Sequence, residues 1–142
     1  MKKNAIQLAA DVSPQTSRIM RSITKKNTRP ELAVRRALHA MGLRFRLHGS
    51  DLPGTPDVIL PRHKAAILVH GCFWHQHPGC KYARLPRARP EYWLPKLRRN
   101  AARDTESRKA LRSKGWRVFV IWECETKDIR ILTCRLHRVP IR

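Results

Sequence analysis

Four possible zinc ligands constrain the fold of this chain more than any other feature. Three lie within nine residues in the pattern Cys-x4-His-x2-Cys, and the fourth follows a strongly apolar segment much later: Cys72, His77, Cys80 and Cys124. Three thiolates and one imidazole form a common tetrahedral zinc set. A shared ion would bring the loop after residue 71 beside residue 124 and would anchor a segment that has few core-forming residues.

Other interpretations of these residues stay open. Reduced, buried cysteines and a surface histidine would need no metal, and His75 is a further candidate ligand, although it would raise the count to five. A disulfide is not expected, because nothing in the sequence suggests secretion. The remaining cysteine, Cys134, is expected to be buried in an apolar setting.

The charge of the chain indicates a polyanionic partner. Lysine and arginine total 31 against 10 aspartate and glutamate, a net charge of +21 over 142 residues, and 42% of the residues are apolar. One domain with its own hydrophobic core is therefore expected over residues 1–142. Nucleic acid is the favoured partner, and an anionic membrane surface is the weaker alternative.

No segment has the features of a membrane span or a secretion signal. No wholly apolar run is longer than that of residues 65–69, which is far too short to cross a bilayer, and polar residues interrupt any signal core near the start. We expect a cytoplasmic protein without membrane association, in which residues 1–12 form a flexible arm and residues 126–142 a basic extension.

Apolar periodicity and capping residues predict a mixed α/β fold. Thr28 and Glu31 have capping-box spacing, and Gly42 follows the last apolar position of that helix. The predicted helices cover residues 13–23, 29–41 and 91–113, the strands cover 43–47, 57–60, 65–70 and 116–122, and residues 71–90 form a structured loop. One more short helix is expected in the remainder. This order favours a mixed sheet with helices on its faces.

One predicted hairpin brings a carboxylate and an imidazole together. A turn at residues 61–64 would join two antiparallel strands, with Asp57 opposite Leu68. The side chains of Asp57 and His70 would then point to the same face, about 7–8 Å apart. Such a carboxylate could hold Mg²⁺, and a neutral histidine could activate water or protonate a leaving group. A turn role for Asp57 and a backbone-carbonyl contact for His70 stay open.

Aromatic residues surround the expected zinc loop. Phe73 and Trp74 lie between two candidate ligands, and Trp93 lies near the start of the long helix. They could form a small core around the metal. Alternatively, they could wedge between base pairs, at an unstacking cost that is lower at a mismatch.

Five segments, in order, resemble the very-short-patch repair (Vsr) endonucleases: MRSITKKNTRPE, DLPGTPDVIL, AILVHGCFWHQH, EYWLPKLRRNAARD and GWRVFVIWEC. The resemblance covers roughly residues 13–125. It implies a single nuclease domain with a restriction-endonuclease-like mixed β-sheet flanked by helices and a zinc-bound loop. The implied activity is a Mg²⁺-dependent nick in double-stranded DNA, beside the thymine of a T:G mismatch left by deamination of 5-methylcytosine. It implies a monomer and is compatible with transient contact with other mismatch-repair proteins.

The resemblance also implies catalytic roles. Asp57 would be the central Mg²⁺ carboxylate, and the main-chain carbonyl of Val69 would be a further ligand, with two Mg²⁺ ions expected in all. His75 would activate the attacking water, His70 would assist at the phosphate, and Glu31 matches an acidic residue near the metal. The four zinc ligands would be those named above. The sequence Val69-His70-Gly71 lacks the Glu-x-Lys of many nucleases of this fold, so histidine would replace lysine.

The remaining matches are expected DNA contacts. Three aromatic residues match side chains inserted beside the mismatch: Phe73, Trp74 and Trp93. Three N-terminal residues match a segment that approaches the minor groove: Met20, Arg21 and Ile23. Three residues share a helix face as outer-sphere or DNA-backbone contacts: Asn100, Arg103 and Asp104. A related nuclease without mismatch preference and a zinc-stabilised DNA- or RNA-binding module without chemistry are the alternatives.

Overall fold

A computed structural model describes residues 26–139 of the chain. The predicted helix over residues 13–23, the flexible arm over residues 1–12 and the segment with Met20, Arg21 and Ile23 lie outside the described residues. Among the described helices, none combines the length and the apolar composition needed to cross a bilayer.

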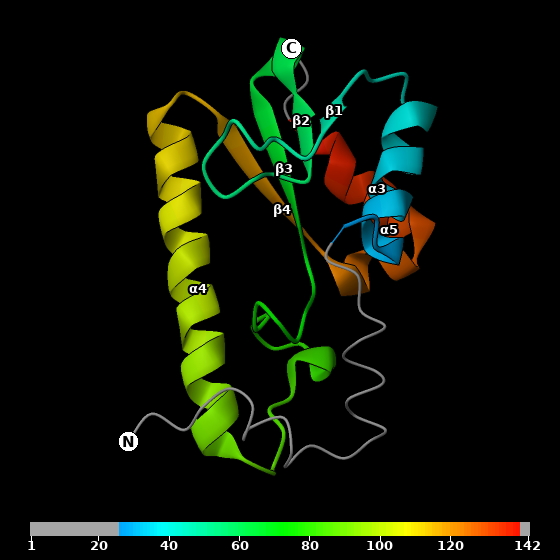
Figure 1. The fold of residues 1–142 in the computed structure, drawn as a ribbon. Helices are drawn as coiled ribbons and strands as arrows, with labels where there is room; N and C mark the ends of the chain where they lie inside the picture. The colour runs from blue at the N-terminus through cyan, green and yellow to red at the C-terminus, as the bar shows by residue number, and fades with distance from the viewer. Residues whose placement is uncertain (1–25, 140–142) are drawn as a thin grey trace.

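The described elements form a four-stranded mixed sheet with helices on both sides (Figure 1). The helices are α3 (Arg29–Ala40), α4 (Pro90–Ser113) and α5 (Ile129–His137), and the strands are β1 (Arg46–Leu47), β2 (Val58–Leu60), β3 (Ala65–His70) and β4 (Arg117–Trp122). The strand order is β1-β2-β3-β4. This arrangement confirms the predicted mixed α/β fold, including the short helix near the C-terminus.

The edge strand β1 is shorter than the predicted strand over residues 43–47. Only Arg46 and Leu47 pair with β2. Beyond them, Pro61 begins a 3-10 turn that ends the partner strand. The apolar residues before β1, Leu43 and Phe45, pack against the core instead.

The register of the central hairpin is the predicted one. β2 and β3 are antiparallel, with Val58 opposite Ile67 and Leu60 opposite Ala65. A 3-10 turn joins them, and Lys64 adopts a left-handed conformation with φ of 51°. Continuing this register by one position puts Asp57 opposite Leu68, beside the end of β3.

β3 and β4 are parallel neighbours over six pairs, from Ala65 opposite Arg117 to His70 opposite Trp122. Parallel strands need a long crossover connection. Here the connection consists of the loop after β3, which carries Cys72, His77 and Cys80, and of α4. The pairing therefore brings residues that are far apart in the sequence to one end of the sheet.

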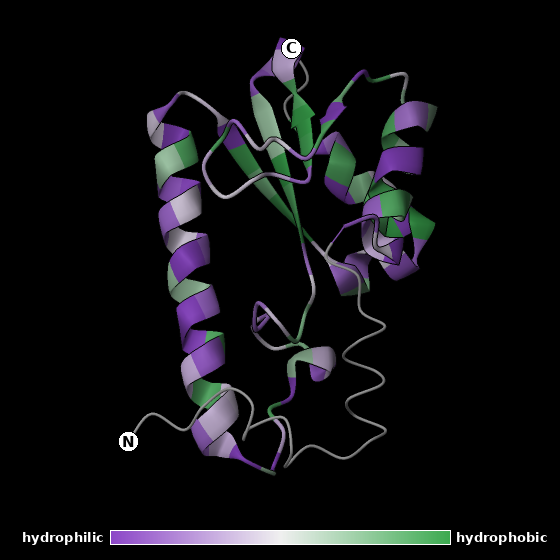
Figure 2. Ribbon diagram, viewed as in Figure 1, coloured by the Kyte–Doolittle hydropathy of each residue, from purple (hydrophilic) through white to green (hydrophobic). Residues whose placement is uncertain are grey.

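The hydrophobic core lies between the sheet and the pair α3 and α5. Its buried members include Val34 and Leu38 of α3, Leu132 and Leu136 of α5, and Ile67 of β3. The strands are mostly apolar, whereas α4 is hydrophilic over most of its surface (Figure 2). Because α4 buries only Leu97 and Leu111, most of its side chains remain available for a polar or charged partner.

Candidate active site and metal centre

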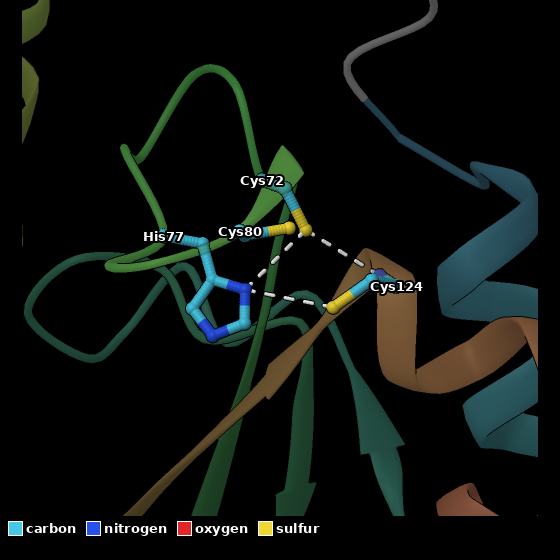
Figure 3. Close-up of side chains that lie close together, drawn as sticks. All are labelled: Cys72, His77, Cys80 and Cys124. Carbon is cyan, nitrogen blue, oxygen red and sulfur yellow. Dashed lines mark hydrogen bonds between the residues drawn. The ribbon is translucent and has the colours of Figure 1, made fainter. Parts of the chain in front are cut away.

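The four possible zinc ligands converge in space (Figure 3). The Nδ1 atom of His77 lies 3.7 Å from the Sγ atom of Cys72 and 3.5 Å from that of Cys124. The ligand atoms of these three residues and Cys80 all lie within 4.8 Å of one another. Tetrahedral zinc with bonds of about 2.3 Å to sulfur and 2.0 Å to nitrogen places its ligand atoms about 3.5–3.8 Å apart. The cluster therefore has the donor set and the spacing of a zinc site.

The parallel pairing explains how the remote ligand reaches the loop. His70 pairs with Trp122, and the same offset of 52 residues, two positions further along, brings Cys124 beside Cys72. The N–H of Cys124 donates to the Sγ atom of Cys72 at 3.4 Å. Burial raises the pKa of the Cys72 thiol to about 12, so a bound cation is needed to keep this sulfur ionised at neutral pH.

Cys134 is exposed, so the prediction that it is buried is wrong. It lies on α5 midway between Leu132 and Leu136, which are the residues that α5 buries. Residues four positions apart share a helix face, and the residue between them points to the opposite side.

A cavity of about 820 Å³ is lined by all four predicted catalytic residues. Its walls include Glu31, Asp57, Val69, His70 and His75. These residues come from α3, from the segment before β2, from β3 and from the loop after it. Trp74 also lines this cavity, and so do four residues that sequence reasoning did not place there: Lys96, Asp104, Ser107 and Glu123.

Asp57 is held at the end of β3 by one short hydrogen bond. The N–H of Val69 donates to Oδ2 of Asp57 at 2.7 Å. Burial raises the pKa of Asp57 to about 6; the bond from Val69 opposes this rise, and the nearby carboxylate of Glu31 adds to it. A partly desolvated carboxylate with a second carboxylate nearby is a favourable ligand for a divalent cation.

Glu31 takes part in the N-terminal cap of α3 and also lines the cavity. Its N–H donates to the Oγ1 atom of Thr28 at 3.4 Å, which confirms the predicted cap of α3. Its carboxylate does not return to Thr28. Instead, Oε2 accepts the N–H of Asn27 at 3.0 Å and pairs with Nη2 of Arg35 at 3.2 Å. The Glu31 residue is only 3% exposed, so Arg35 compensates its charge in a dry environment.

His70 and His75 form a stacked pair beside Asp104. Their ring centroids lie 3.9 Å apart with planes 6° from parallel. His75 Nδ1 lies 2.5 Å from Oδ2 of Asp104, so His75 belongs to this group and not to the Cys/His cluster. Burial and the neighbouring His75 lower the pKa of His70 to about 4, which leaves His70 neutral at physiological pH.

Asp104 was predicted only as an outer-sphere or DNA-backbone contact. The structure places it on His75, where a carboxylate fixes the tautomer with the proton on Nδ1 and leaves Nε2 free to accept a proton. The signal in the sequence was weak, because only the spacing from Asn100 pointed to a shared helix face.

The three predicted DNA-contacting aromatics form one half-exposed cluster. Phe73 lies 5.1 Å from Trp74 and 5.4 Å from Trp93 between ring centroids, and Trp74 and Trp93 lie 6.0 Å apart. Tyr92 packs edge-on against Trp93, and Nζ of Lys96 lies 5.4 Å from the ring of Trp74. The rings therefore pack against one another, and each ring keeps part of its surface exposed to solvent.

Asn100 of α4 holds the loop at Trp74. Its Nδ2 atom donates to the main-chain oxygen of Trp74 at 3.2 Å, and Arg103 donates to its Oδ1 atom at 3.2 Å. Asn100 and Arg103 also line a smaller cavity of about 320 Å³ that adjoins His75 and Asp104.

A family model described as DNA mismatch endonuclease Vsr matches residues 11–81. The chain is 50% identical over 129 residues to the type II nicking enzyme V.XorIIP of Xanthomonas oryzae pv. oryzae, covering 90% of this chain and 94% of the relative. It is 37% identical over 126 residues to the DNA mismatch endonuclease Vsr of Escherichia coli K12, covering 87% and 80%. The chain belongs to the Vsr family.

As a Vsr-family protein, the chain is a DNA endonuclease, and its substrate is DNA. This excludes the alternative of a binding module without chemistry. The Vsr family also accounts for the coexistence of a large basic surplus and a cavity lined by carboxylates, because a nuclease must bind a polyanion and also hold cations against it.

In this Vsr-family endonuclease, the loop before Asp57 packs tightly on α4 at a glycine. A Cβ atom at Gly54 would lie 2.5 Å from Cβ and 2.7 Å from Oγ of Ser107, and Gly54 has φ of +70°. We expect Gly54→Ala to destabilise the protein by about 1–3 kcal/mol and to slow nicking, because the loop carrying Asp57 would move away from His75. Thermal unfolding and a nicking assay measure both effects.

The control for this substitution is Gly42→Ala. Gly42 has φ of +75° but no atom within 4 Å of a Cβ atom built there, so it reports backbone strain alone. Adding Ser107→Gly to Gly54→Ala is expected to restore part of the stability and the activity. Equal effects of the two single alanine substitutions would show that the contact with Ser107 does not matter.

Proposed function

We propose that this endonuclease nicks one strand of double-stranded DNA next to the thymine of a T:G mismatch that arises from deamination of 5-methylcytosine. The observation that carries the proposal is the constellation at the end of β3, where Asp57, bonded to the N–H of Val69, shares one cavity with the stacked pair of His70 and His75. The E. coli relative, named as a DNA mismatch endonuclease, supports the mismatch specificity.

We assign Mg²⁺ to the carboxylate of Asp57 and the main-chain carbonyl of Val69, and we assign assistance to a second ion to Glu31, which lines the same cavity. Bound there, Mg²⁺ would neutralise the charge that develops on the phosphate oxygens. The donors fit a hard cation because they are oxygens, one of them on the half-buried carboxylate of Asp57, whose pKa is raised. The Cys/His cluster fits zinc by its softer donors and its spacing.

The histidines supply the proton chemistry. With Nδ1 of His75 bonded to Asp104, the free Nε2 atom accepts the proton of the attacking water, and Asp104 stabilises the imidazolium that results. His70, neutral because of its low pKa, donates an N–H hydrogen bond to a phosphate oxygen. One task needs an imidazole that accepts a proton, and the other needs an imidazole that donates a hydrogen bond. The different surroundings of His75 and His70 suit them to these two tasks.

The basic surface and the aromatic cluster have separate roles in this proposal. The surplus of positive charge binds DNA of any sequence in a salt-sensitive manner. Phe73, Trp74 and Trp93 wedge beside the mismatch, where unstacking costs least. A single nuclease domain acts as a monomer.

A nicking assay on one labelled duplex tests the proposal. The duplex carries T:G or T:A at the same position and is incubated with and without Mg²⁺. A nick in the thymine strand of the T:G duplex alone, and only with Mg²⁺, is the expected result. Equal cutting of both duplexes would favour a related nuclease without mismatch preference, and cutting without a divalent cation would contradict the role of Asp57.

The pH dependence of stability tests the environment of Asp57. In the metal-free protein, the raised pKa of about 6 means that protonated Asp57 stabilises the fold below its unfolded pKa and that this stability is lost as pH rises through 6. Asp57→Asn is therefore expected to be more stable than the wild type at pH 7.5 by about 3 kcal/mol.

This difference between the two proteins is expected to shrink by roughly 1–2 kcal/mol between pH 7.5 and pH 5. Urea unfolding with a magnesium chelator at both pH values measures it, and common effects of pH on the other groups cancel in the comparison. A difference that does not change with pH would show that Asp57 is not desolvated.

A further inference from the structure

A row of aromatic rings connects the Cys/His cluster to the catalytic histidines. His77 and Trp122 are stacked, with ring centroids 4.1 Å apart and planes 10° from parallel. Trp122 meets His70 at 5.3 Å with an interplanar angle of 74°. His70 in turn stacks on His75 at 3.9 Å. The sequence of rings is therefore His77, Trp122, His70 and His75.

Within residues 26–139, the position of the His70 imidazole is fixed by these ring contacts. His70 is only 6% exposed, so solvent does not orient it. His75 lies on one of its faces, and that ring is itself tied to Asp104. Trp122 is the second ring against it. Removing the indole would leave His70 with one of its two aromatic-ring contacts, the stack on His75.

The fold places Trp122 at this point for a simple reason. Trp122 ends β4 and pairs directly with His70, which ends β3. Paired residues on neighbouring strands point to the same face of a sheet. The turn that follows β4 is fixed by the N–H of Trp122, which donates to Oε1 of Glu125 at 3.0 Å. The indole is thus anchored at the backbone and by the ring of His77.

We propose that Trp122 is a positioning residue that holds the imidazole of His70 at the scissile phosphate by packing between His70 and His77. Trp122 makes no contact with DNA in this role. Because its indole contacts both His77 and His70, the position of the metal-binding cluster determines the position of His70. This inference rests on the proposed role of His70 in nicking.

The test compares Trp122→Leu with Trp122→Phe. Leucine keeps an apolar side chain but removes the ring, whereas phenylalanine keeps a smaller ring in the same place. The matched control is Trp116→Leu, because Trp116 precedes the other end of β4 and contacts Lys64, remote from His70 in the strand register. Each protein is checked for zinc content and for circular dichroism before use.

Single-turnover nicking of a T:G duplex is expected to slow by about 10–100-fold in Trp122→Leu, the usual effect of losing a residue that orients a catalytic group. The dissociation constant for DNA should stay within about threefold of the wild-type value, because only the chemical step is affected. Trp122→Phe should recover most of the rate, and Trp116→Leu should lose little.

The proton and carbon resonances of the imidazoles supply a readout that does not depend on activity. The ring of Trp122 shifts the signals of His70, which Trp122→Leu should move or broaden, while the signals of His39 on α3 should not change. A Trp122→Leu protein with wild-type zinc content and an unchanged nicking rate would overturn the proposal. If Trp122→Leu loses zinc, the nicking rate of Trp122→Phe tests the proposal instead. A Trp122→Phe rate as low as that of a His70→Ala protein would also overturn the proposal.

These outcomes are distinct from failure of the proposed function. A wild-type enzyme that cuts T:G and T:A duplexes equally would contradict the mismatch specificity. The effect of Trp122 on the His70 signals and on the rate of cutting would still be measurable in that enzyme.

Discussion

Replacing Asp57 by alanine is expected to abolish Mg²⁺-dependent nicking while DNA binding is preserved or becomes tighter. A metal ion that stabilises the transition state by several kcal/mol accounts for a rate loss of at least about 1,000-fold. Binding improves because a negative charge is removed from the cavity that faces the phosphate. Single-turnover nicking and an electrophoretic binding assay on the same T:G duplex measure the two effects.

Asp51→Ala is the matched control for this prediction. Asp51 lies in the same segment before β2, but its side chain is 61% exposed and pairs with Arg46 at 3.6 Å. The substitution removes the same charge, so it should affect long-range attraction to DNA similarly and leave nicking intact. Comparable loss of nicking in both variants would point to disturbance of the segment and not to a lost metal ligand.

Replacing Cys124 by serine is expected to release zinc and to unfold the loop that carries Phe73, Trp74 and His75. The free energy of binding a structural zinc ion is part of the folding free energy, so we expect the midpoint of thermal unfolding to fall by about 10 °C or more. Nicking should be lost with it. Metal analysis of the purified protein and differential scanning calorimetry measure the change.

The chain supplies its own control for the cysteine chemistry. Cys134→Ser makes the same substitution at an exposed residue of α5, outside the cluster. It should keep the zinc content, the unfolding midpoint and the activity of the wild type. Retention of zinc and full stability by the Cys124→Ser protein would contradict the assigned ligand set.

Local sequence patterns predict the elements of this fold well. The cap at Thr28, the turn before Ala65 and the apolar runs of β3 and β4 depend on residues close together in the chain, and the hairpin register follows from the length of its turn. The position of Asp57 beside the end of β3 could be predicted for the same reason.

The remaining features of the site depend on contacts between distant segments. The parallel pairing of β3 with β4 has no local signal, so the row of rings through Trp122 could not be predicted from pattern alone. The approach of Cys124 to Cys72 was predicted from the shared zinc ligand set, but the strand pairing that produces it was not. The pairing of His75 with Asp104 likewise depends on how α4 packs along the sheet. The spacing of cysteine and histidine predicted the four zinc ligands, and the hairpin register predicted the approach of Asp57 to His70. Resemblance to a known family added the proposed role of His75, but it did not give the geometry.

Because β4 lies late in the sequence, the site cannot be completed until most of the chain has been synthesised. Chains fold from the N-terminus as they emerge, and the early part of this chain already carries Asp57, His70 and His75. The strand that pairs with β3 and the last cysteine of the metal cluster follow more than forty residues after His75. A chain that stalls before residue 117 thus has the residues to which we assign catalysis, but it lacks the strand that pairs with β3. We therefore expect such an incomplete chain not to cut DNA.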